Sequence, residues 1–209
     1  PEKKILLYAG SSKGTDEYKH LRIIDEAIEN GIFTNLKVVY RPHPWGGGGK
    51  GGERILKHSW INISIESTMK NYLQNITNGG SVNSFPDYHD THDVLSSVDI
   101  VVSPLSTILL EAAMHAKPTL CFLPIEESNA RHFQLDSSLK HFEDLFKMEE
   151  FLVAKGYNEL IPMLENLIEK SEDIDFINNY AEISNYFVKS FEKSYKQRLV
   201  DFCELIVVK

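Results

Sequence analysis

Three short polar segments follow apolar, strand-like runs and carry side chains that suit an anionic ligand. They are Gly10–Thr15, Arg41–Pro44 and Ser103–Thr107. In an open sheet of parallel strands, ligands bind beyond the carboxyl ends of the strands, so binding residues are expected in the loops that follow strands. Hydroxyl, imidazole and guanidinium groups all donate hydrogen bonds to phosphate oxygens. The three segments therefore predict a site for a phosphate-bearing ligand.

The third segment ends a buried strand and opens a helix. Ser106 is a good N-cap candidate, and the backbone N–H groups after it can point at an anion, with the helix dipole adding roughly 0.3–1 kcal/mol. The alternative is that Ser106 or Thr107 merely caps the helix, and this segment alone does not decide between the two. Glu111, one turn beyond Thr107 on the same face, could hold a pair of ribose hydroxyls. Most helical glutamates are exposed instead, but the apolar residues on both sides of Glu111 indicate a buried helix.

His43 stands between two prolines, which restrict its backbone and present the ring from a stiff loop. We interpret His43 as a phosphate contact, with a structural or exposed histidine as the alternative. Arg41 is a weaker phosphate candidate, because it could pair with an acidic residue. Ser11 and Ser12 are expected to offer backbone N–H groups to a diphosphate, in a loop that matches neither the dinucleotide fingerprint nor the P-loop.

The run Asp87–Asp93 mixes histidine with aspartate and could hold a metal ion. Helix capping explains Asp90 and Asp93 without a metal, since a helix is expected to begin there, so no metal site is predicted. The chain has neither a Gly-x-Ser-x-Gly elbow nor a His-Glu-x-x-His helix, and no hydrolytic centre is predicted.

The elements that would position these residues alternate between strands and helices. Strand-like runs occupy 5–9, 36–40, 99–103 and 119–123, with a weaker one at 60–65; helical spacing covers 16–30, 69–76, 91–97 and 106–115. The glycine-rich stretch 45–53 is predicted to be a mobile loop, and helical segments broken near Gly156 and Pro162 are expected after Pro124. This alternation predicts an α/β fold with a Rossmann-like, doubly wound, mostly parallel sheet. We assign residues 1–156 to that domain and 157–209 to a C-terminal helical segment.

Length and composition limit the classes of function that this chain can have. The 209 residues, 42% hydrophobic and 25% charged, suit a globular chain that buries its own core. A net charge of −8 argues against a nucleic-acid partner, because binding to a phosphate backbone needs clustered Lys and Arg. No apolar run is long enough for a transmembrane segment, and Cys121 and Cys203 suggest neither a disulfide framework nor a metal site. We expect a cytoplasmic protein, free or peripheral at the inner face of the membrane.

Three segments together resemble the C-terminal, donor-nucleotide domain of GT-B-fold glycosyltransferases. They are Tyr8–Ser12, Arg41–Pro44 and Val98–Thr107, the last continuing through Glu111 to Pro118. A His-Pro pair with a later Ser-Thr pair is similar to bacterial sialyltransferases, polysialyltransferases and capsule-type transferases, and to glycerophosphotransferases that use cytidine-activated donors.

The resemblance implies a role for each candidate residue. His43 would contact the nucleotide phosphate at the catalytic centre, Ser106 and Thr107 would bind phosphate, and Glu111 would hold the ribose. The remaining binding candidates are Ser11, Ser12, Arg41 and Ser103. No cofactor is expected beyond the activated donor, whose nucleotide is expected to be cytidine-based in preference to UDP or GDP.

We therefore expect a glycosyltransferase domain that acts in the biosynthesis of polysaccharides, including capsules. It would transfer a sugar or a polyol phosphate from a nucleotide-activated donor to a surface glycan. In GT-B enzymes the catalytic base comes from the N-terminal domain, so a further domain of the same protein is expected to supply it. The C-terminal helical segment would pack on the nucleotide domain or on that further domain. Half of a nucleotide-sugar 2-epimerase and a non-catalytic nucleotide-binding module are the alternatives.

Overall fold

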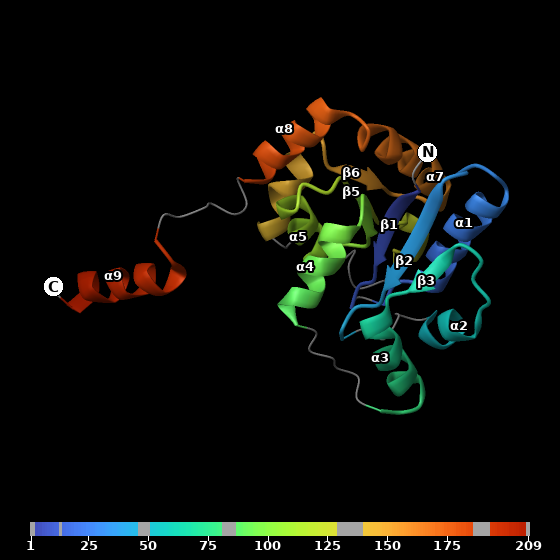
Figure 1. Ribbon diagram of the computed structural model, residues 1–209, viewed down its shortest axis with the longest axis horizontal. Coiled ribbons are helices and arrows are strands. Elements are labelled where there is room, and N and C mark those ends of the chain that lie inside the picture. Colours follow the sequence, from blue (N-terminus) through green and yellow to red (C-terminus); the bar gives the residue numbers. More distant parts are fainter. Residues whose placement is uncertain are drawn as a thin grey trace.

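A six-stranded sheet lies between two layers of helices (Figure 1). The computed structural model describes residues 3–12, 14–45, 51–80, 87–128, 140–185 and 193–207. The strands are β1 (Lys4–Ala9), β2 (Leu36–Arg41), β3 (Ile63–Ile65), β4 (Ile100–Ser103), β5 (Thr119–Phe122) and β6 (Leu152–Ala154).

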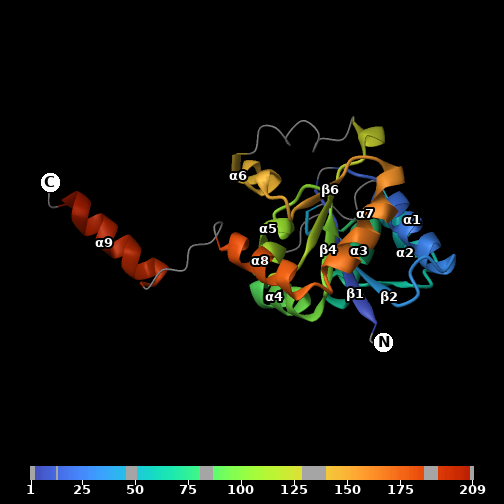
Figure 2. The ribbon, with the colours of Figure 1, turned by 90° about the horizontal axis from the view of Figure 1, so that it is seen from above.

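Helices cover both faces of the sheet (Figures 1 and 2). The helices of the described residues, including one that does not lie on the sheet, are α1 (Glu17–Glu29), α2 (Gly52–Lys57), α3 (Ser67–Thr77), α4 (Tyr88–Ser97), α5 (Ile108–Met114), α6 (Lys140–Glu143), α7 (Tyr157–Lys170), α8 (Ile174–Ser184) and α9 (Tyr195–Val207), with short 3₁₀ turns η2 (Ile125–Glu127) and η4 (Leu145–Lys147). Both views show α9 standing apart from the rest of the molecule. Within the described ranges, no helix combines the length and apolar character that crossing a bilayer requires.

The strand order is β3-β2-β1-β4-β5-β6, and every neighbouring pair is parallel. Parallel neighbours need crossover connections, and here helices supply them on both faces. The predicted α/β, Rossmann-like, doubly wound sheet is confirmed, and its order is the one typical of dinucleotide-binding domains.

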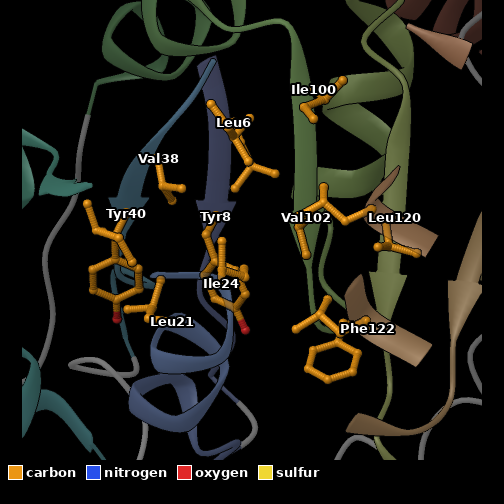
Figure 3. Close-up of a cluster of buried hydrophobic side chains, with 14 of the residues drawn as sticks. Leu6, Tyr8, Leu21, Ile24, Val38, Tyr40, Ile100, Val102, Leu120 and Phe122 are labelled. Atoms are coloured by element: carbon orange, nitrogen blue, oxygen red, sulfur yellow. The ribbon is translucent and has the colours of Figure 1, made fainter. Parts of the chain in front are cut away.

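The main core lies on the face covered by α1 and α7. Figure 3 shows alternate residues of four strands packing there against Leu21 and Ile24 of α1. The strand residues are Leu6, Tyr8, Val38, Tyr40, Ile100, Val102, Leu120 and Phe122. Successive strand side chains point to opposite faces, so Leu7 and Val101 instead meet Leu95 of α4 on the other face. The central strands are buried on both sides, which explains their continuous apolar runs.

Helix α7 departs from the predicted break at Pro162. It runs through Pro162 from Tyr157 to Lys170. The missing proline N–H removes one bond to the preceding turn, and such a residue ordinarily kinks or ends a helix. The fully buried Leu160, Leu164 and Leu167 place the helix in the main core, and this burial outweighs the lost bond. The assignment of 157–209 as a separate helical segment stays a prediction.

Two elements were not predicted, α2 and β6. Strand β6 is three residues long, which is too short to show an alternating apolar pattern in the sequence. It is recognised as a strand by its parallel pairing with β5. Helix α2 begins inside the glycine-rich stretch, of which 46–50 lie outside the described residues. A Cβ at Gly51 would lie 2.5 Å from the Cβ of Tyr18, so glycine there allows the close approach to α1.

Candidate functional site

The strand order creates a switch point at the carboxyl end of β1. Strands β2 and β3 lie on one side of β1, and β4, β5 and β6 lie on the other. The chain leaves β1 for α1 on one face of the sheet, whereas it leaves β4 for α5 on the opposite face. The two loops therefore diverge, and this is the place where open α/β sheets bind ligands.

The strand register places the predicted residues at adjacent strand ends. Ala9 of β1 pairs with Arg41 of β2. Tyr8 pairs with Val102 of β4, so the following residue, Ser103, lies level with Ala9. The loop 10–12 continues directly from β1. Three segments thus meet at one edge of the sheet, although Ala9 and Ser103 lie 94 residues apart in the sequence (103 − 9).

The Ser103 hydroxyl is fully buried at this edge. Among the residues that the structure describes, its Oγ has no hydrogen-bond partner. A buried polar group left in this state costs about 1–3 kcal/mol, and native proteins pair nearly all such groups. A ligand oxygen at the switch point would give the hydroxyl a partner.

The Arg41 side chain is buried, and two of its guanidinium nitrogens are hydrogen-bonded to α4. Its guanidinium donates to Oγ1 of Thr91 at 3.0 Å and to the backbone carbonyl of Asp90 at 3.4 Å. Burial lowers the pKa of Arg41, and the nearby carboxylates Glu66, Asp90 and Glu111 oppose that effect. Arg41 therefore fastens α4 to β2 and brings a positive charge to the site.

The ring of His43 is oriented by its own loop. The backbone N–H of Trp45 donates to Nδ1 of His43 at 3.0 Å. In the neutral imidazole the proton must then be on Nε2, which makes Nε2 a donor. The loop is held from outside by the hydroxyl of Tyr72, which donates to the carbonyl of Pro44. His43 is half-buried in the loop that follows β2, and the stiffness of this loop stays a prediction.

The start of α5 differs from the prediction in one respect. Thr107 is the N-cap instead of Ser106, in helical geometry, and its side chain makes no capping bond. A purely capping role is therefore wrong for Thr107, and the phosphate-binding role of the two residues stays a prediction. Glu111 is half-buried; burial raises its pKa and the charge of Arg41 opposes the rise. Arg41 and Glu111 are thus electrostatic neighbours, as a shared site requires.

Beneath the loop after β1 lies a carboxylate that the sequence analysis did not identify, Glu17. Ser11 donates its backbone N–H to Oε1 of Glu17 at 2.7 Å, and the hydroxyl of Tyr40 donates to Oε2 at 2.5 Å. Glu17 therefore already accepts from the Ser11 N–H in this structure, and the expectation that this N–H binds a diphosphate stays a prediction. Ser12, which is exposed, keeps the predicted position beside the switch point.

A second buried network joins α1, η2 and α7 through Glu127. Its Oε1 accepts from Nε2 of His20 at 2.8 Å and from the hydroxyl of Tyr157 at 2.5 Å, and its Oε2 accepts from the N–H of Asp16 at 3.0 Å. The Tyr8 hydroxyl bonds to Nδ1 of His20 at 2.5 Å. These contacts hold the far end of the loop 10–16 and fix where α1 begins.

One signal in the sequence could have revealed Glu17. It lies four residues before Leu21 and seven before Ile24, on the same apolar stripe of α1. A carboxylate at such a position is buried with its helix face. Because acidic residues in the first turn of a helix are usually explained by the helix dipole, the burial of Glu17 is easily overlooked.

The run at 87–93 begins a helix one turn earlier than predicted. Helix α4 starts at Tyr88, and Asp87 is the capping residue, accepting from the N–H of His89 at 3.1 Å. The assignment of capping to Asp90 and Asp93 is therefore wrong. Across the described ranges, no group of three or more His, Cys, Asp or Glu is placed to hold a metal ion.

Comparisons with known proteins find similarity in structure alone. No protein-family model and no curated protein sequence matches the chain. Among solved structures, a putative UDP-N-acetylglucosamine 2-epimerase from Listeria monocytogenes is similar with a TM-score of 0.50 and 12% identity, over 92% of this chain and 47% of that one.

Two further structures are less similar. The wall teichoic acid polymerase TagF has a TM-score of 0.47 and 13% identity, over 99% of this chain and 44% of that one. WaaG, a glycosyltransferase of lipopolysaccharide biosynthesis, has a TM-score of 0.45 and 14% identity, over 91% of this chain and 44% of that one. This chain spans less than half the length of each of the three. The likeness to the first of the three shows the fold alone, a Rossmann-like α/β unit, as predicted.

Proposed function

We propose that this chain binds the nucleotide part of an activated donor at the carboxyl ends of β1, β2 and β4, and serves glycosyl transfer. The observation that carries the proposal is the buried Ser103 hydroxyl, which has no partner in the described ranges and lies at the switch point. A phosphate oxygen accepts from hydroxyl, imidazole and guanidinium groups, and Ser103, His43 and Arg41 supply all three kinds.

The chemistry assigned to these residues is stabilisation of the leaving group. When the bond between the transferred group and the phosphate breaks, negative charge develops on the phosphate oxygens. Fixed donors that face those oxygens favour the transition state over the bound donor. The Nε2–H of His43 and the hydroxyls of Ser103, Ser106 and Thr107 are such donors, and Glu111 would accept from the ribose hydroxyls. The catalytic base and the glycan acceptor are assigned to a further domain.

Cytidine is the proposed base, supported by the resemblance of the His-Pro and Ser-Thr pairs to enzymes that use cytidine-activated donors. The transferred group would be a sugar or a polyol phosphate, and the acceptor a surface glycan or polysaccharide. The similar structure with a TM-score of 0.50 is named as a putative UDP-N-acetylglucosamine 2-epimerase, which favours an epimerase half as the second candidate. Both candidates bind a nucleotide sugar, so the first test concerns the nucleotide.

Nucleotide binding is expected to stabilise the chain and to depend on His43. CDP at about 100 times its dissociation constant should add about 2.7 kcal/mol to the free energy of unfolding, and UDP and GDP should add less at the same concentration. The variant His43→Ala should weaken binding about tenfold, because one charge-assisted hydrogen bond is lost. Urea unfolding with and without nucleotide measures the first effect, and calorimetric titration measures the second. The control His89→Ala removes an exposed imidazole of α4 and should bind as the parent does.

If none of CMP, CDP, UDP and GDP binds, the proposed function is wrong. If UDP binds in preference to CDP, the cytidine assignment fails and the epimerase candidate gains support. Equal affinity in His43→Ala and the parent would remove His43 from the site.

The variant Ser103→Ala is expected to separate ligand binding from stability. Without ligand, removal of a buried hydroxyl that lacks a partner should leave the free energy of unfolding unchanged or raise it by up to about 1 kcal/mol. Nucleotide affinity should fall severalfold, because the ligand loses a donor. Urea unfolding and calorimetric titration provide the two readouts. A loss of stability above about 1 kcal/mol without ligand would show that the hydroxyl has a structural role instead.

A further inference from the structure

Glu17 is a fully buried carboxylate placed directly under the loop that follows β1. Its two oxygens are held from two sides, by the N–H of Ser11 at 2.7 Å and by the hydroxyl of Tyr40 at 2.5 Å. A Cβ at Gly10 would lie 2.5 Å from Oε2, so the absence of a side chain at Gly10 is what lets the carboxylate reach the loop. The carboxylate and the loop therefore form one packed unit.

The surroundings of Glu17 let it exchange a proton near neutral pH. Burial raises the pKa of Glu17 to about 7, against the lowering effect of hydrogen bonds from Tyr40 and Ser11, and the charge of Glu127 adds to the rise. The tyrosines beside it remain neutral in this range, because burial raises the pKa values of Tyr8 and Tyr40 well above their usual level.

The other charged groups near Glu17 come from α1 and η2. Glu127 of η2 acts on Glu17 by its charge and contacts His20 of α1, and Asp16 is the N-cap residue directly before Glu17. Although burial opposes it, the bonds from His20, Tyr157 and Asp16 lower the pKa of Glu127 to about 2, so Glu127 stays ionised throughout the neutral range. No cation contacts the Glu17 carboxylate among the hydrogen bonds and ion pairs of the described residues.

An ionised Glu17 opposes an anion at the switch point in two ways. It keeps the Ser11 N–H, a donor that a phosphate would otherwise take. It also repels the anion: two like charges about 7 Å apart at an effective dielectric constant of about 20 change an equilibrium constant by roughly tens of fold. Protonation of Glu17 removes the repulsion and weakens its hold on the Ser11 N–H.

We propose that a phosphate-bearing ligand binds at the switch point together with one proton, and that Glu17 takes up that proton. This inference rests on the proposed nucleotide site and concerns its regulation: affinity rises as the pH falls through neutrality. The proton comes from solvent and returns to it when the ligand leaves, so no other reactant is needed.

The test is calorimetric titration of the full chain with CDP between pH 6.5 and pH 8.5. Affinity of the parent should fall about 25-fold over this range, as for a site that binds only when a group of pKa about 7 is protonated. At pH 7.5, titrations in two buffers of different ionisation enthalpy should show uptake of about 0.8 proton per ligand. In Glu17→Gln the side-chain amide can accept from the Ser11 N–H and donate to the Tyr40 hydroxyl. The pH dependence of affinity and the proton uptake should then vanish, except for the part that the titration of CDP itself contributes.

Two further variants make the result specific. Glu26→Gln changes an exposed carboxylate of the same helix and should keep the pH profile of the parent. Tyr40→Phe removes a bond that lowers the pKa of Glu17 and should move the profile to higher pH, which tests the inference even if Glu17→Gln fails to fold. Binding with the same pH dependence and proton count in the parent and in Glu17→Gln, or an unmoved profile in Tyr40→Phe, overturns this inference alone. Absence of CDP binding at every pH overturns the proposed site as well.

Discussion

Replacing Glu127 with alanine is expected to lower the free energy of unfolding by about 3–5 kcal/mol, because three donors lose one acceptor and a buried polar group left without a partner costs about 1–3 kcal/mol. The Glu127 side chain is 11% exposed and the His20 side chain is fully buried. Its removal leaves His20, Tyr157 and the N–H of Asp16 without their acceptor. Urea unfolding followed by circular dichroism measures the change.

The neighbouring Glu126 provides a matched control. It is exposed and, among the described residues, accepts one bond, from the N–H of Tyr157 at 3.1 Å. The variant Glu126→Ala should therefore cost less than about 1 kcal/mol, as surface changes usually do. Equal losses in the two alanine variants would show that the network around Glu127 contributes nothing special to stability.

Stability is expected to fall by about 3 kcal/mol between pH 4 and pH 8 on account of Glu17 alone. The pKa of Glu17 is about 7 in the folded protein, against 4.5 for an ordinary glutamate. Between these values the folded state holds a proton that the unfolded chain has lost, so raising the pH favours unfolding. The loss is nearly complete at about pH 8, one unit above the folded-state pKa, where both states are ionised.

The variant Glu17→Gln isolates this contribution, because glutamine does not titrate. Its free energy of unfolding, measured relative to the parent, should rise by about 3 kcal/mol from pH 4 to pH 8. Glu127 acts in the opposite direction and at lower pH: its pKa of about 2 gives stability above pH 4.5 that is lost as the pH falls toward 2. That contribution is common to parent and variant and cancels in the difference. A difference that stays constant with pH would contradict the burial-raised pKa of Glu17.

Most of the fold could be predicted from local patterns. The apolar runs of β1, β4 and β5 are continuous because helices cover both faces of the central strands, and this pattern alone indicates a doubly wound sheet. Asp16 caps α1 as its residue type suggests, accepting from the N–H of Lys19. Strand β6 was not predicted, because three residues are too few to show an alternating pattern. The helix break predicted at Pro162 was wrong, because burial of α7 outweighs the one hydrogen bond that the proline removes.

The candidate site was predicted in part. Loops after strands are identifiable, and Arg41, His43 and Ser103 lie where that rule places them. Which donors remain for a ligand was not predictable, because Ser11 gives its N–H to Glu17 and Arg41 gives two bonds to α4. The binding roles of these residues stay predictions.

The sequence by itself determined the alternation of strands and helices and the three polar loops, because these depend on near neighbours: apolar period, capping residues and glycine. Only the tertiary structure decided that Ser103 is buried without a partner in the described ranges, and that Glu17, Tyr40 and the loop after β1 share one packed unit. Those properties depend on burial and on contacts between strands far apart in the chain, and the pKa of Glu17 follows from burial. Proton exchange near neutrality is therefore a property of the folded chain alone.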